Sequence, residues 1–136
     1  MANGTIAFDT LSTSGQISGT AKSVDTDYVA HGTFKATITF NGTGTVAIRK
    51  SFNIASLVDD SSGNYSINST NGMDSSEYLV SAVCGNYDAA NPGPKTHTAN
   101  PNSSTDSSVE TMDSSDAANS DVAYVGIGYI GDLAWQ

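Results

Sequence analysis

Basic residues and cysteines are scarce in this sequence, and each shortage excludes a class of function. The chain of 136 residues carries five Lys and Arg against fourteen Asp and Glu, which gives a net charge of −9. Nucleic acids and anionic membrane surfaces bind proteins through clustered basic residues, so we expect neither as a partner. The single cysteine, Cys84, excludes an intrachain disulfide.

Long apolar runs and helical periodicity are also missing. No segment is long and apolar enough for a transmembrane helix, and Met1 to Thr5 lack the basic and apolar regions of a signal peptide. We therefore expect a protein that is made in the cytoplasm and is not secreted by a signal peptide. Ser, Thr, Asn, Asp and Gly dominate the rest of the chain, which is typical of β-rich proteins with many turns.

The clearest strand pattern lies between His31 and Leu57. Apolar residues alternate there with polar ones, as in a half-buried strand, at Phe34, Ala36, Ile38 and Phe40. Asn41-Gly42 then favours a tight reversal, and a second alternating run follows at Val46, Ile48, Phe52 and Ile54. These features predict a β-hairpin. Because Arg49-Lys50-Ser51 is polar on both sides, we expect its second strand to contain a bulge or to form an exposed edge.

Three further segments carry strand patterns. Tyr65 to Ser69 alternates as a short strand between turn-forming residues. Tyr78 to Cys84 and Val122 to Ile130 are apolar on both faces, a pattern found in central strands, sandwich interiors and subunit interfaces. Together the patterns predict an all-β fold, either an antiparallel β-sandwich or a jelly-roll-like domain with long loops.

Composition divides the chain into an arm and one domain. Residues 1–27 form an N-terminal arm, which either packs as an edge strand or holds a neighbouring subunit, and residues 28–136 form the β-sandwich domain. Within the domain, Gly85 to Asp121 is rich in Ser, Asn and Asp and contains all three prolines. It predicts a long polar loop, residues 85–121, with one strand near Ser108 to Met112. Long ordered loops of this kind are usually functional.

A glycine motif near the end of the sequence has a structural explanation. Gly126-Ile127-Gly128-Tyr129-Ile130-Gly131 matches the dinucleotide-binding pattern G-x-G-x-x-G. That mechanism needs a helix after the motif and an acidic residue about 20 positions onward, whereas five residues follow here. We therefore interpret these glycines as sites of close backbone or sheet-to-sheet approach. Gly93-Pro94-Lys95-Thr96 lacks the spacing of a phosphate loop and predicts a turn.

The residues that most often carry catalysis or bind metals lie in no recognisable motif. His31 and His97 belong to no nucleophile pattern, and Cys84 in an apolar strand predicts a small buried hydrophobe. Acidic pairs such as Asp113 with Asp116 lack EF-hand spacing and suit turns. We predict no catalytic site, cofactor or metal, with structural calcium at one of the acidic clusters as the alternative.

Five segments together resemble, in the same order, blocks of small structural proteins of marine and cyanobacterial tailed phages, often labelled tail fibre or virion proteins. They are MANGTIAFDTLSTSG, KSVDTDYVAHGT, FNGTGTVAIRKSFNIASLVDDSSGNYSIN, NGMDSSEYLV and YVGIGYIGDLAW. The resemblance implies a β-sandwich-like domain, assembled as a homotrimer at an exposed point of a virion. It carries over no functional residues. Longer relatives place such a domain after an extended shaft, which is not present in this sequence, so the resemblance favours a short tip, head fibre or decoration protein.

From the resemblance we expect a phage virion structural protein, a small fibre or tip module for host-surface attachment, whose arm serves assembly or virion attachment. The loop 85–121 is the candidate recognition surface, with Tyr87, Lys95, His97, Asp106 and Asp113 as its candidate contacts. The expected partners are further copies of the chain, other virion proteins, and a host surface glycan or protein. The alternatives are a capsid decoration protein and a carbohydrate-binding module that stacks sugars on Tyr87, Tyr129 or Trp135.

Overall fold

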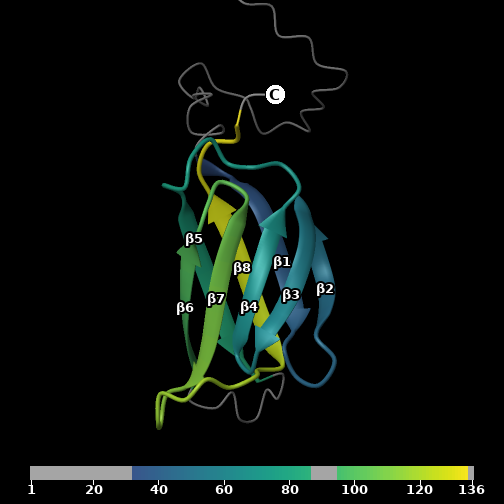
Figure 1. Cartoon of the computed structure of the whole chain (residues 1–136), viewed down its shortest axis with the longest axis vertical. Coiled ribbons are helices and arrows are strands. Elements are labelled where there is room, and N and C mark those ends of the chain that lie inside the picture. The colour runs from purple at the N-terminus through teal and green to yellow at the C-terminus, as the bar shows by residue number, and fades with distance from the viewer. Residues whose placement is uncertain (1–31, 87–94, 135–136) are drawn as a thin grey trace, which may run out of the picture.

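The computed structural model describes residues 32–86 and 95–134, which form eight β-strands in two stacked sheets (Figure 1). Sheet A has the strand order β2-β1-β8-β5 and sheet B the order β3-β4-β7-β6, with every neighbouring pair antiparallel. The predicted antiparallel β-sandwich is therefore confirmed. The strands are β1 (Phe34–Asn41), β2 (Ala47–Phe52), β3 (Ile54–Ser61), β4 (Asn64–Ser69), β5 (Leu79–Gly85), β6 (Lys95–Pro101), β7 (Asp106–Asp113) and β8 (Tyr124–Ile130).

The predicted hairpin is the β1–β2 pair, and both expectations for its second strand are confirmed. β2 lies at the edge of sheet A, and all six of its residues are exposed. Thr39 pairs with Lys50 and Phe40 pairs with Ile48, so Arg49 is the extra residue of a bulge. The expected continuation of this strand to Ile54 is wrong, because the chain leaves sheet A after Phe52 and Ile54 begins β3 in sheet B.

Asn53 makes this crossing between the sheets in a single residue. Its φ is 56°, in the left-handed region that Asn tolerates better than most residues with a Cβ. Its side-chain amide donates to the carbonyl oxygen of Lys35 at 3.0 Å, and its Oδ1 accepts from the backbone N–H of Asn71 at 2.9 Å. The same side chain thus ties the crossing to β1 and to the segment after β4.

The core lies between the inner faces of the two sheets. Phe40 of sheet A packs edge-to-face on Tyr65 of sheet B, with ring centroids 4.9 Å apart. Such contacts join alternating inward residues, as the period of an extended strand requires. The buried apolar residues are Ala36, Ile38, Phe40, Tyr65, Ile67, Met73, Val109, Val122, Val125, Ile127 and Tyr129.

The segment 85–121 differs most from expectation. It was predicted as a long polar loop, but it contains β6 and β7, which form half of sheet B. The strand expected near Ser108 to Met112 lies within β7 and is confirmed. Alternation is weak in the sequence because two inward positions of β7, Ser107 and Thr111, are polar yet buried. The hydroxyl of Thr111 donates to the carbonyl oxygen of Ser120 at 2.7 Å, which satisfies it inside the protein.

The two strands that are apolar on both faces occupy different places in sheet A. β8 is a central strand, whereas β5 lies at the edge. The glycines of β8 were predicted to allow close approach of backbone or of another sheet. Two of them instead allow close approach of side chains from neighbouring strands. A side chain at Gly128 would collide with the ring of Phe34, and a Cβ at Gly126 would stand 3.1 Å from Cγ1 of Val83. The N-terminal arm and Trp135 lie outside the described residues.

We predict that Asn53→Ala lowers the free energy of unfolding by about 2–3 kcal/mol, because it removes the amide hydrogen bonds and places a Cβ-bearing residue without compensation at positive φ. Asn53→Gly, the matched control, loses the same hydrogen bonds but tolerates the backbone conformation, so its loss should be about 1 kcal/mol smaller. Urea unfolding measures both. Equal losses would show that the backbone conformation at the crossing contributes nothing.

Candidate functional site

The predicted recognition residues do not form a single site. β6 and β7 run antiparallel, with Lys95 opposite Asp113 at one end and Pro101 opposite Ser107 at the other. Asp106 therefore lies at the opposite end of the sandwich from Lys95 and Asp113. Tyr87 lies outside the described residues.

Lys95 and Asp113 form an ion pair at the end of the sandwich that is lowest in Figure 1. The Lys95 Nζ atom lies 2.9 Å from Oδ2 of Asp113, and the ammonium-bearing side chain is largely buried. The other carboxylate oxygen accepts from the backbone N–H of Ser115 at 3.0 Å and from its hydroxyl at 2.7 Å. These hydrogen bonds, the one from Lys95 first, hold the pKa of Asp113 well below its usual range. The ion pair joins the start of β6 to the end of β7, so both charged groups already have partners within the protein.

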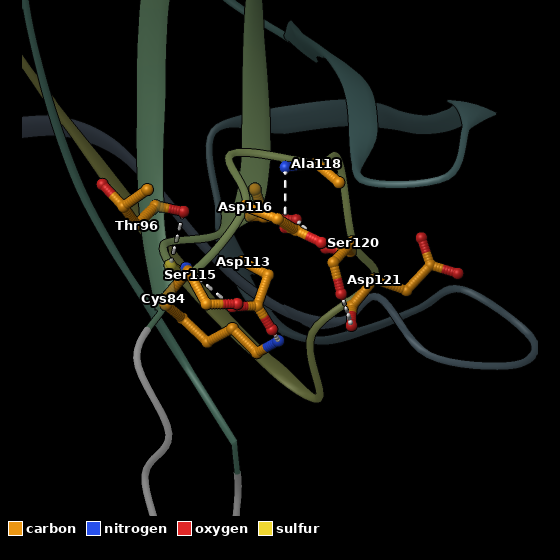
Figure 2. A network of polar contacts seen from close by, with 10 residues as sticks. Cys84, Thr96, Asp113, Ser115, Asp116, Ala118, Ser120 and Asp121 are labelled. Atoms are coloured by element: carbon orange, nitrogen blue, oxygen red, sulfur yellow. Dashed lines mark hydrogen bonds and ion pairs between the residues drawn. The ribbon is translucent and has the colours of Figure 1, made fainter.

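The turn after β7, residues 113–121, is fixed by hydrogen bonds (Figure 2). The backbone N–H of Asp113 donates to the carbonyl of Ala118 at 2.9 Å, and the backbone N–H of Ala118 donates to Oδ1 of Asp116 at 3.0 Å. Oδ1 of Asp121 accepts from the backbone N–H of Gly63 at 2.7 Å, which joins the turn to the β3–β4 connection. The turn is therefore a rigid, acidic surface at this end of the sandwich.

His97 and Cys84 meet where β5 and β6 lie side by side. The Cys84 thiol donates to the carbonyl oxygen of Thr96 at 3.3 Å, and its sulfur lies 3.8 Å from Nδ1 of His97. Burial raises the pKa of the Cys84 thiol, whereas a nucleophilic cysteine needs a lowered one. Cys84 is half-buried, so it is more accessible than the small buried hydrophobe expected from the sequence.

Neither a cluster of metal-binding side chains nor a membrane-spanning helix is found among the described residues. Across residues 32–86 and 95–134, no three His, Cys, Asp or Glu side chains gather in a position to hold a metal ion. The same residues include no helix that is long and apolar enough to cross a membrane.

The outer face of sheet A is the surface that stands out. Four of its side chains are large, apolar and more than half exposed: Phe34 at 52%, Phe52 at 62%, Leu79 at 60% and Val83 at 54%. We call these four residues the apolar face. A register shift between Phe34 and Ala36 turns Phe34 outward, although simple alternation had placed the two on one side.

Charge is divided between the two sheets. The four strands of sheet A contain three basic residues and no acidic one, whereas those of sheet B contain five acidic residues and one basic one. The apolar face thus lies on strands that carry no carboxylate, although the molecule as a whole is acidic. Sequence analysis indicated excess apolar surface in β5 and β8, but the charge division appears only once distant strands are paired.

Comparison with protein-family models, with curated proteins and with solved structures finds no match to this chain. The resemblance to phage structural proteins therefore stays a prediction, and the fold and surfaces described above rest on the chain's own residues.

We predict that Asp113→Asn makes stability less sensitive to acid. A carboxyl whose pKa is lowered on folding stabilises the native state fully above its ordinary pKa, about 4, and this stabilisation is lost as the pH falls further. Between about pH 5 and pH 2, the wild-type protein should therefore lose stability more steeply than the variant. Thermal unfolding across this range measures the difference.

A matched control is Asp60→Asn, which changes an exposed carboxylate that accepts a hydrogen bond from Ser66. Asp113→Asn should flatten the loss of stability in acid more than this control does. If the two variants showed the same dependence on pH, the ion pair and hydrogen bonds of Asp113 would have no energetic weight.

Proposed function

We propose that this protein is a non-enzymatic structural module of a tailed-phage particle, a small fibre or tip that works as a homotrimer in attachment to the host surface. The observation that carries the proposal is the apolar face. Large exposed apolar patches on a folded domain mark interaction surfaces, and this one has no acidic group among its strands. The ordered sequence blocks that resemble phage structural proteins supply the biological setting.

The opposite side of the molecule supports a role in contact with an outside surface. Sheet B and the turn 113–121 present hydroxyl, amide and carboxylate groups held in place by short hydrogen bonds. Binding surfaces are often built from polar loops on a rigid scaffold. In this proposal Lys95 and Asp113 support the recognition end, and the exposed residues of the turn make the contacts.

The proposal also includes two features beyond the β-sandwich itself, namely a jelly-roll-like arrangement and assembly as a homotrimer. The sandwich supplies the rigid scaffold whether or not it is described as jelly-roll-like, and the homotrimer supplies several copies of the recognition end. Several weak contacts on one particle raise the overall strength of attachment without any new contact in the single copy.

The carbohydrate-binding alternative loses one of its three predicted platforms. Tyr129 is 1% exposed, and its hydroxyl lies 2.7 Å from that of Ser107, so its ring is not accessible for stacking on a sugar. Tyr87 and Trp135 lie outside the described residues. None of the three predicted platforms is therefore an exposed ring among the described residues.

The proposal predicts that the protein is part of purified particles and lies at the tail tip or fibres. Antibodies against the folded protein, labelled with gold, should decorate those positions, and their Fab fragments should reduce adsorption to host cells. Labelling of the head lattice in many copies would move the role to capsid decoration. Particles without the protein would contradict a virion function altogether.

A further inference from the structure

We infer that the apolar face is the surface through which copies of this chain meet, so that each copy turns sheet A toward the others and sheet B outward. This inference rests on the homotrimer of the proposed function, which by itself names no interface.

The apolar face continues across the strands of sheet A. Phe34 of β1 and Leu79 of β5 both pair with Ile130 of β8, so the three residues form one row across the sheet. Phe52 of β2 lies in the next outward row, because it pairs with Thr37, which pairs with Gly128. The ring of Phe34 lies over Gly128 and so reaches from the first row toward the second. Side chains that face the same way in one row form a contiguous surface.

Glycines make this surface flat. Gly126 and Gly128 are two of the outward residues of β8, and they are covered by Val83 and by the ring of Phe34. A flat apolar sheet can pack closely against another sheet, as the two sheets of one sandwich do. The large apolar side chains that remain more than half exposed after this covering are the four of the apolar face.

Charge indicates that the occupant is a second copy. Copies with a net charge of −9 repel each other unless they meet through a region without carboxylates. The strands of sheet A are such a region. With sheet A turned inward, the outward carboxylates of Asp106 and Glu110 on sheet B point away from the neighbouring copies.

Sheet B provides the contrast within the same molecule. Its outward positions pair polar groups, such as Asn64 with Glu110 and Asn68 with Asp106. On the strands of sheet B, one large apolar side chain is exposed, that of Val58 in β3, at 44%. A subunit contact through sheet B would thus bury carboxylates against a chain of the same sign, which is unfavourable.

The test is the native mass of the full-length chain at low micromolar concentration. We expect a trimer for the wild-type protein and dissociation to monomers for Phe52→Asp and for Leu79→Asp, whose trimer dissociation concentration should rise roughly thirtyfold or more. In the single chain the side chain of Phe52 is 62% exposed and that of Leu79 is 60% exposed, so circular dichroism should show an unchanged fold. The matched control is Val58→Asp on sheet B, which should remain a trimer.

Two results would overturn the inference directly. One is a monomeric wild-type protein across this concentration range, and the other is a trimer that survives both substitutions on sheet A. A trimer of this kind that is absent from phage particles would contradict the virion function and leave the interface intact, so the two failures are distinguishable.

A labelling experiment covers the case in which the charged variants fail to fold. Ser81 is exposed between Leu79 and Val83 on β5, and Thr98 is exposed on sheet B. In a Cys84→Ser background, the Ser81→Cys variant should react with a thiol reagent at least about tenfold more slowly than the Thr98→Cys variant, and dilution into the monomer range should remove the difference. Equal rates in the concentrated protein, or slow labelling at every dilution, would contradict the inference. The second outcome would point to residues 1–31 of the same chain as the cover.

Discussion

Two buried tyrosines hold the sheets of this sandwich together, one from each side. Tyr65 of sheet B packs against Phe40 and donates its hydroxyl to the carbonyl oxygen of Gly42 beside sheet A, at 3.1 Å. Tyr129 of sheet A reaches Ser107 of sheet B, with 2.7 Å between the hydroxyl oxygens, and burial raises its pKa to about 12. Each ring contributes apolar area while its hydroxyl finds a partner, which is the condition for burying such a residue at low cost.

The hydroxyl of Tyr65 also connects the core to the turn 113–121. It lies 3.3 Å from Oδ1 of Asp121, and the same carboxylate oxygen accepts from Gly63. Burial, followed by the nearby charge of Asp121, raises the pKa of Tyr65, so the group stays a neutral donor. A chain poor in apolar residues thus uses one side chain both to fill the core and to fix the turn 113–121.

The sequence predicts those elements whose inward residues are apolar. β1, β4 and β8 follow from alternation or apolar runs, and the bulge at Arg49 follows from polarity on both sides of β2. β6 was missed because Ala99 is the apolar residue that packs on the core from its polar sequence. β7 was predicted only near Ser108 to Met112, because its inward residues Ser107 and Thr111 are polar. The apolar face was only partly predictable from the sequence, because it depends on how distant strands pair. Phe34 points outward because of a register shift, and the absence of carboxylates from sheet A becomes visible only when three separate stretches are paired.

The distribution of apolar residues argues for assembly rather than for folding alone. Sheet B places Ser107 and Thr111 in the core, whereas sheet A exposes Phe52 and Leu79 to water. If the single domain were the functional state, exchanging such residues between inner and outer positions would bury more apolar area and increase stability. Exposed side chains of this size contribute little to the stability of one copy, but they contribute fully once a partner covers them. The uneven use of apolar residues therefore supports the proposed contact between copies through sheet A.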